Sequence, residues 1–163
     1  MPLVRDATRH DRAELIAVRD TPTLHDQYLA EADGEGLRYL VYERGGRIVG
    51  FALLILRRLT SGVPPTDLPK ISDLHIATAN RSKGYGADFI ARMEAIAREW
   101  GHDRMYIGVD PIENPRALEL YRRLGYSPLQ TTPYLKVAML DDGHGKVEQR
   151  SYWRVDLMKA LSG

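Results

Sequence analysis

The stretch Arg81-Ser82-Lys83-Gly84-Tyr85-Gly86-Ala87 decides the fold, because it joins a predicted strand to a predicted helix through two closely spaced glycines. The preceding run, Ile71 to Ala77, reads as a strand. The following segment, Ala87 to Trp100, carries apolar residues at the three-to-four spacing of a helix that buries one face. A helix start exposes about four unpaired backbone N–H groups and a partial positive charge, so it attracts anions.

The residue types of this loop predict a diphosphate site. Gly84 and Gly86 remove side chains that would block close approach to the backbone, and Arg81 and Lys83 add cationic groups beside the same amides. The competing interpretation is a tight strand-to-helix turn with two surface cations. Other phosphate motifs fit poorly: a nucleoside-triphosphate loop needs Gly-Lys-Ser/Thr, and a dinucleotide loop needs a third small residue where Phe89 stands.

Working outward from the loop, the sequence predicts a mixed α/β (α+β) domain. Its expected core is a central, mixed, mostly antiparallel twisted sheet of six to seven strands with helices on both faces. The order strand-helix-strand-helix around the loop implies one parallel crossover in the middle. A Pro-rich stretch, Ser61 to Asp67, reads as a loop between strands. The remaining predicted strands are Leu3–Asp6, Leu37–Glu43, Arg47–Leu56, Met105–Val109, Leu135–Leu140 and Gln149–Met158, and the remaining helices are Arg9–Arg19, Leu24–Ala32 and Pro115–Leu124.

Composition bounds the class of protein. The 163 residues are 44% hydrophobic, which suits one domain over residues 1–163. Lys plus Arg number 23 against 22 for Asp plus Glu, so we expect neither nucleic acid nor a membrane surface as partner. The longest apolar run, Ile48 to Leu56, is too short to span a bilayer, and the absence of cysteine fits a cytoplasmic protein. The histidines lack metal-ligand spacing, so we expect no metal.

A second informative segment, Asn114-Pro115-Arg116-Ala117-Leu118-Glu119-Leu120-Tyr121, precedes a Gly125-Tyr126 step. Local structure explains most of it, since Asn114 is a good helix N-cap and Pro115 suits the first helical turn. Tyr121 alone would be read as a core tyrosine. The functional alternatives are that Asn114 contacts a ligand and that Tyr121 acts as an acid.

The two segments together resemble the GNAT superfamily of N-acetyltransferases, whose loop signature is Arg/Gln-x-x-Gly-x-Gly/Ala after a strand. The same superfamily carries Asn-x-x-Ala-x-x-x-Tyr followed by Gly-Tyr or Gly-Phe. The resemblance implies a GNAT-like acyl-CoA N-acyltransferase fold, with acetyl-CoA as the acyl donor. It also implies that the strand before the loop pairs with the pantetheine arm and that an amide near Ile76 faces the thioester oxygen. The cofactor-binding residues that it implies are Leu74, His75, Ile76, Arg81, Ser82, Lys83, Gly84, Tyr85, Gly86, Ala87, Asn114, Ala117 and Tyr121.

The chemistry gives Tyr121 and Asp73 candidate catalytic roles. A phenol can donate a proton to a leaving thiolate, so Tyr121 is the expected general acid. The attacking amine must lose a proton, and Asp73 is the candidate base, with His75 on the same strand face by period two unless a bulge intervenes. Asp73 matches an acidic position in polyamine acetyltransferases, which this stretch is similar to, but Ser72 stands where they carry glutamate. A structural hydrogen-bonding role for Asp73 stays open.

The expected activity is direct acetyl transfer to a primary amine of a small molecule or peptide in a ternary complex, because no acyl-enzyme nucleophile is evident. Tyr28, Glu31 and Tyr134 are candidate neighbours of the acceptor. A non-catalytic acyl-CoA-binding regulatory module and a cofactor-free structural domain are the alternatives. The last two predicted strands could also pair across a homodimer.

Overall fold

The computed structural model describes residues 2–57 and 68–161, and the loop predicted from Ser61 to Asp67 lies outside them. Predicted and observed elements agree closely, although β6 was not predicted and the first predicted helix begins as a 3-10 turn. No described helix is long and apolar enough to cross a bilayer. In chain order the elements are β1 (Leu3–Asp6), η1 (Arg9–Asp11), α1 (Arg12–Val18), α2 (Pro22–Glu31), β2 (Leu37–Arg44), β3 (Arg47–Ile55), β4 (Lys70–Ile76), η2 (Thr78–Asn80), α3 (Tyr85–Glu99), β5 (Arg104–Val109), α4 (Pro115–Arg123), β6 (Ser127–Pro128), β7 (Tyr134–Asp141) and β8 (Val147–Ala160).

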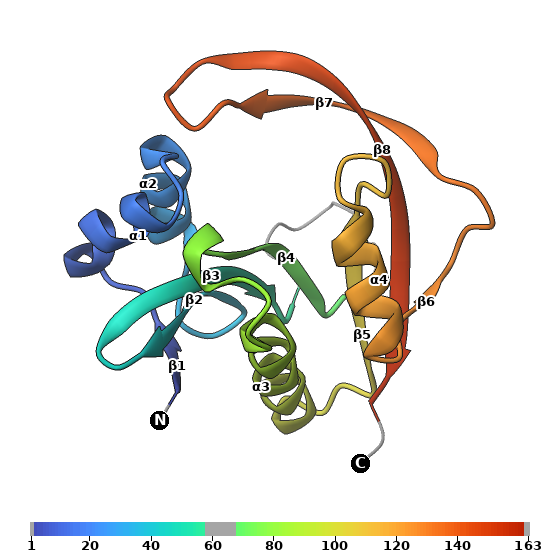
Figure 1. The fold of residues 1–163 in the computed structure, drawn as a ribbon, viewed down its shortest axis with the longest axis horizontal. Coiled ribbons are helices and arrows are strands. Elements are labelled where there is room, and N and C mark those ends of the chain that lie inside the picture. Colours follow the sequence, from blue (N-terminus) through green and yellow to red (C-terminus); the bar gives the residue numbers. More distant parts are fainter. Residues whose placement is uncertain (1, 58–67, 162–163) are drawn as a thin grey trace.

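The strands form one mixed, mostly antiparallel sheet, which confirms the predicted fold class. Seven of them are ordered β1-β2-β3-β4-β5-β8-β6, and β7 pairs with β8 beside this path. Among the described strands the only parallel neighbours are β4 and β5, which α3 connects as the predicted crossover. Figure 1 shows this order from blue to red.

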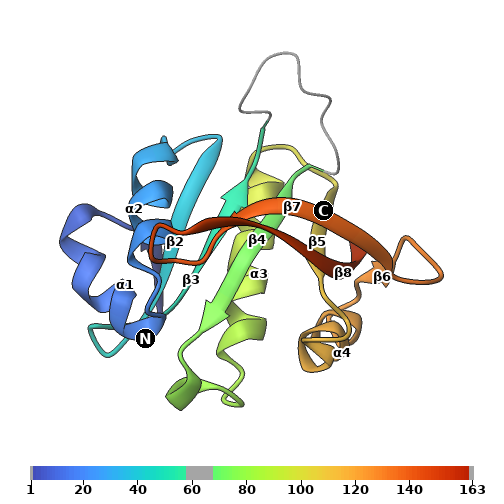
Figure 2. The same ribbon diagram turned by 90° about the horizontal axis from the view of Figure 1, so that it is seen from above.

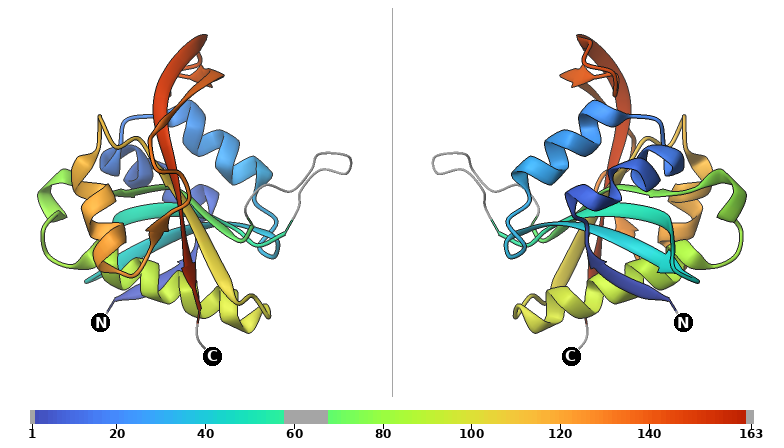
Figure 3. Two further views of the ribbon diagram at one scale, coloured as in Figure 1. Left: turned by 90° about the vertical axis from the view of Figure 1, so that its right-hand side faces the viewer. Right: turned by 90° about the vertical axis from the view of Figure 1, so that its left-hand side faces the viewer.

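Helices cover both faces of the sheet, so the molecule has two apolar cores. Residues of α3 and α4, with Phe89 and Met93 at the centre, pack on one face. Leu15 of α1 and Tyr28 of α2 pack on the other, around Phe51. Figure 3 shows α2 and α3 on opposite sides of the sheet. The three-to-four apolar spacing of α3 thus produces the packing that its sequence predicts.

Local residue choice explains where the main elements turn. Gly45 and Gly46 both take positive φ between β2 and β3, as a two-residue hairpin turn requires. Asn114 precedes α4, and its Oδ1 accepts a hydrogen bond from the Ala117 N–H (3.3 Å), with Pro115 in the first turn.

The two last long strands form an arm. Residues 147–154 of β8 pair with β7, whereas residues 155–160 pair with β5 in the main sheet. The arm arches from the sheet toward α2 (Figure 1). At its tip the Gly143 carbonyl accepts from the Thr23 N–H (3.0 Å), and the Thr23 hydroxyl donates to Asp141 (2.9 Å). The arm is therefore fixed at both ends.

Candidate active site

The parallel strands β4 and β5 pair only at their beginnings. Lys70 faces Tyr106 and Ile71 faces Ile107, and no further pair follows among the described residues. The strands then diverge toward their carboxyl ends (Figure 2). The facing edges of β4 and β5 beyond these positions are consequently open to a ligand's hydrogen bonds.

Ile76 lies at this open edge of β4. The N–H of the next residue, Ala77, donates to the Val49 carbonyl of β3 (2.8 Å). Because successive N–H groups of a strand point to opposite edges, the Ile76 N–H points away from β3. The Ile76 carbonyl accepts a hydrogen bond from Arg81 Nε (2.9 Å). Leu74 and Ile76 pack their half-buried side chains against the core beside α3.

Six consecutive backbone N–H groups, from Ser82 to Ala87, donate to no protein acceptor in the part of the chain that the structure describes. The next one, of Asp88, bonds to the Gly84 carbonyl (3.1 Å). These groups form the turn and first residues of α3, a helix of 15 residues whose dipole adds partial positive charge at the same place. The arrangement is suited to an anion.

The loop backbone takes the left-handed conformation twice, at Ser82 (φ 64°) and Gly84 (φ 81°). A side chain at Gly84 would cost about 1–2 kcal/mol in this conformation. Gly86 differs, because a Cβ there would lie an ordinary 3.6 Å from Leu120 Cδ2. The packing of the chain itself does not require glycine at position 86.

The side chains of the loop divide into an anchor and two cations. Tyr85 is half-buried, with its ring 5.8 Å from that of Tyr42 and the Arg44 guanidinium 4.7 Å above it. Arg81 and Lys83 are exposed on the same turn as the unpaired amides. The anchored loop thus presents its positive charge toward solvent.

On α4 the structure shows how Asn114 and Ala117 are used. Asn114 caps the helix through Oδ1, as the structural interpretation predicts, and the cap occupies the Ala117 N–H. The Asn114 side-chain NH2 has no protein acceptor among the described residues, which leaves it available to a ligand. Ala117 packs half-buried against the core beside α3.

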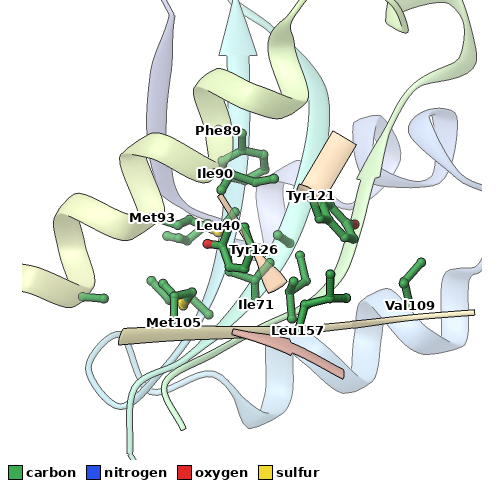
Figure 4. Close-up of a cluster of buried hydrophobic side chains, with 14 of the residues drawn as sticks. Leu40, Ile71, Phe89, Ile90, Met93, Met105, Val109, Tyr121, Tyr126 and Leu157 are labelled. Carbon is green, nitrogen blue, oxygen red and sulfur yellow. The ribbon is translucent and has the colours of Figure 1, made fainter. Parts of the chain in front are cut away.

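Tyr121 is buried, 6% exposed, but its hydroxyl is unpaired among the described residues. The hydroxyl still reaches solvent, because the described chain contains no fully enclosed polar side-chain atom without a partner. Its ring packs against Tyr126 (centroids 6.4 Å apart), and Figure 4 shows the two hydroxyls pointing in opposite directions. Burial raises the pKa of Tyr121 to about 12, so the phenol keeps its proton at physiological pH.

Asp73 lies in a β-bulge, at φ 50°, where the register of β3 and β4 shifts between Phe51 and Leu53. Arg19 donates to both carboxylate oxygens (2.7 and 2.8 Å), and the Tyr28 hydroxyl donates to Oδ2 (2.7 Å). Burial acts to raise the pKa of Asp73, but the hydrogen bonds and charge of Arg19 outweigh it and the pKa is lowered. An ionised carboxylate with both oxygens bonded is a poor proton acceptor.

His75 contacts the same aromatic and cationic cluster as Asp73. Its ring stacks on Phe51 (centroids 5.6 Å apart), and the Arg19 guanidinium lies 4.8 Å from that ring. Burial, and then the charges of Arg19 and Arg81, lower the pKa of His75 to about 4. The imidazole is therefore neutral at physiological pH, 3.5 Å from Arg81 Nη2.

The sequence interpretation missed Arg19 and His25. Arg19 is 54 residues from Asp73, so no local pattern links them. His25, to which the sequence assigned no role beyond its lack of metal-ligand spacing, is fully buried, with Nδ1 2.6 Å from the Tyr39 hydroxyl and Nε2 2.9 Å from the Arg19 carbonyl. A histidine thus fixes the backbone at Arg19.

The candidate acceptor neighbours occupy separate places. Tyr28 joins the Asp73 cluster. Tyr134 donates to Asp156 (2.7 Å), a carboxylate that also pairs with Arg154 (2.8 Å) on the inner side of the arm. Glu31 is exposed at the end of α2, where it accepts from Gln27 (3.2 Å). Of the three, only Tyr28 contacts a predicted catalytic residue.

Solved structures share this fold over nearly their whole length. The ribosomal-protein-alanine N-acetyltransferase from Brucella melitensis is 22% identical, with a TM-score of 0.69 over 98% of this chain and 99% of its own. The yncA protein from Salmonella typhimurium, solved with its cofactor acetyl-CoA, is 20% identical, with a TM-score of 0.69 over 100% and 95%. A GNAT family acetyltransferase from Elizabethkingia anophelis with acetyl-CoA bound is 15% identical, with a TM-score of 0.61 over 98% of both chains.

The family follows from the sequence. Residues 4–126 match the model of the Acetyltransferase (GNAT) family, which spans both the loop before α3 and the α4 segment. The chain therefore belongs to the GNAT acetyltransferase family, as the resemblance of its two motifs predicts. No curated protein matches the chain.

Proposed function

We propose that this chain transfers an acetyl group from acetyl-CoA to a primary amine of a small molecule or peptide by direct attack in a ternary complex. The run of unpaired N–H groups from Ser82 to Ala87 carries this proposal. A run of free amides at a helix start, with exposed Arg81 and Lys83 beside it, matches the charge and shape of a diphosphate.

The other residues present also fit the cofactor. The amides of Ser82 to Ala87 would hold the diphosphate, and the open edge of β4 from Leu74 to Ile76 would hydrogen-bond the amides of a pantetheine arm. Gly86 supports the fit, because protein packing leaves room for a side chain that a ligand would exclude. When bound, acetyl-CoA supplies an activated thioester.

Two groups have the chemistry that acyl transfer needs. The Ile76 N–H, directed away from β3, would stabilise negative charge on a carbonyl oxygen as an oxyanion-hole donor. Tyr121 holds its proton at Oη, because burial keeps its pKa near 12, and would give that proton to the departing sulfur. The protein has no cysteine, which fits direct attack by the amine.

The sequence leaves Asp73 two candidate roles, as general base or as a structural hydrogen-bonding residue. The hydrogen bonds from Arg19 and Tyr28 favour the structural role. We propose that Asp73 positions Arg19 and the bulge of β4 rather than accepting the amine proton. His75 is a neutral candidate for contact with the acceptor, in addition to the contacts that its ring makes with Arg81 Nη2 (3.5 Å) and the Val18 backbone.

The deciding experiment measures thiol release from acetyl-CoA against a diverse library of primary amines, alongside calorimetric titration with CoA. Release with at least one amine, together with CoA binding, would support the transferase. CoA binding without turnover for any amine would instead indicate an acyl-CoA-binding regulatory module. Absence of CoA binding would refute the cofactor site itself.

A further inference from the structure

One face of the β7–β8 arm is apolar and open to solvent. Cross-strand register places Leu135 opposite Trp153, Val137 opposite Ser151, and Met139 opposite Gln149. Opposed residues of antiparallel strands share a face, so these six, with Val147, form one surface that we call the outer face. Its large apolar members are 44–63% exposed. They are Leu135, Val137, Met139, Val147 and Trp153.

The charged side chains of the arm's paired strands lie mainly on its other face. Lys136, Arg150 and Arg154 alternate with the outer-face residues along the strands, as does Glu148. Asp141 lies on the outer-face side at the arm tip. Its carboxylate accepts hydrogen bonds from the Thr23 hydroxyl and from the backbone N–H groups of Gly143 and Gly145. The only charge on the outer-face side of the paired strands is thus that of Asp141 at the arm tip, which argues against nucleic acid, charged peptides and anionic membranes as partners.

The arm is a preformed platform. Its root is held by the pairing of β8 with β5, and its tip by the bonds of Thr23 with Asp141 and Gly143. A Cβ on Gly143 would come within 2.5 Å of Thr21 Cγ2, which shows how closely the tip is docked. Packing on a fixed surface loses little conformational entropy, so a moderate apolar area can support association.

An uncharged apolar strip is complementary to a copy of itself. Eight cross-strand pairs, at about 3.4 Å per residue, make the arm about 27 Å long. Five half-exposed large side chains give about 500 Å² of apolar area per copy, or about 1,000 Å² for two, the lower limit for a specific interface. That size predicts a dimer that forms reversibly with concentration.

We propose that the outer face packs against the outer face of a second copy of this chain around a two-fold axis that passes near Val137 and Ser151. These two residues are the central cross-strand pair of the strip, so a two-fold contact brings each copy's Val137 close to the other's. Trp153 and Met139 then pack at the two ends of the contact. This dimer is independent of the proposed acetyl transfer.

The absence of cysteine allows a direct test. Val137→Cys places a single thiol near the proposed axis, and Lys136→Cys places one a residue away on the other face. Under mild oxidation at about 50 µM, Val137→Cys should give a disulfide-linked dimer at least tenfold faster than Lys136→Cys. Equal rates for the two variants, or no covalent dimer from Val137→Cys, would overturn the proposal.

Sedimentation velocity tests the same contact without a covalent cross-link. Val137→Lys puts two like charges at the axis and should raise the dimer Kd more than tenfold. Leu3→Lys is the matched control, since Leu3 is 51% exposed against 52% for Val137 but lies on β1. Leu3→Lys should keep the wild-type Kd, and both variants should keep the wild-type melting temperature at a protein concentration at which the wild type is monomeric. A wild-type protein that stays monomeric at 200 µM, or equal weakening by both variants, would contradict the dimer.

Discussion

The loop from Ser82 to Ala87 follows strand β4 in the chain, and the cluster around Asp73 is built on that strand, but the two regions use their polar groups in opposite ways. The loop leaves its N–H groups without protein acceptors among the described residues. In the cluster both oxygens of Asp73 are bonded, by Arg19 and Tyr28. Because an unpaired polar group beside a core is costly unless it meets water or a ligand, the unpaired region is the better candidate for binding.

The same contrast separates the two adjacent tyrosines, and it gives the largest expected effect. The Tyr126 hydroxyl donates to buried Glu94 (2.7 Å), whereas that of Tyr121 has no partner in the described chain. Tyr121→Phe should lower kcat about 10²–10³-fold, as expected for loss of a general acid, with little change in stability. Tyr126→Phe should keep kcat but lower the free energy of unfolding by about 1–3 kcal/mol, because Glu94 loses a buried donor.

Steady-state kinetics with acetyl-CoA and chemical denaturation of both variants check this pair. Equal losses of kcat in the two variants would contradict a specific proton-donating role for the Tyr121 hydroxyl.

Asp73→Asn tests the cluster around Asp73, in which both carboxylate oxygens are hydrogen-bonded. Asp73 and Arg19 form a bidentate ion pair in which both side chains are about a quarter exposed. Losing this pair should lower the free energy of unfolding by about 2 kcal/mol. Asp26→Asn is the matched control, because its pair with Arg12 is half exposed, is screened by solvent and should contribute much less to stability. The pH profile of kcat/KM should keep its limbs in Asp73→Asn. A lost acidic limb would restore Asp73 as the general base.

Gly84→Ala tests the loop from Ser82 to Ala87, whose backbone N–H groups have no protein acceptor among the described residues. Gly84 and Gly101 have similar left-handed φ values, 81° and 89°, and a Cβ added to either would have no other atom within 4 Å. Both alanine variants should therefore lose about 1–2 kcal/mol of stability through backbone strain. Only Gly84→Ala should also weaken CoA binding, by about tenfold, because it disturbs the amides at the start of α3. Calorimetry should show unchanged CoA affinity for Gly101→Ala; equal weakening would place the anion elsewhere.

The comparison also explains what the sequence could predict. The loop and α3 are contiguous, so glycine spacing and helix periodicity were enough to predict the strand, turn and helix there. The hairpin at Gly45-Gly46 was predictable for the same reason. The Asp73 cluster was not, because Arg19 reaches Asp73 across 54 residues and only tertiary packing brings them together.

The arm marks a second limit of the sequence. The strand periods of Leu135 to Leu140 and Gln149 to Met158 predicted two strands, and the structure has both. Strand period does not reveal that β8 changes partner at residue 155, from β7 to β5. The exposed outer face follows from this change, since a strand pair outside the main sheet has no helix layer to cover it.

The smallest effect concerns His75, which lies between the two regions. Its pKa, about 4 in the folded protein against 6.5 for a free histidine, means that the unfolded chain binds its proton first as pH falls. Its contribution to stability is therefore complete above about pH 6.5 and is lost as the pH falls toward 4. His75→Gln removes this dependence.

Melting curves from pH 7 to pH 4.5 should show the fall in Tm reduced by about 3 °C in His75→Gln, corresponding to about 1 kcal/mol after allowance for the exposed part of the ring. His25, whose pKa burial also lowers, keeps part of the dependence in this variant. A curve identical to the wild type would mean that His75 is protonated at the same pH in the folded and unfolded chains. The proposal that a neutral His75 contacts the acceptor would then be wrong.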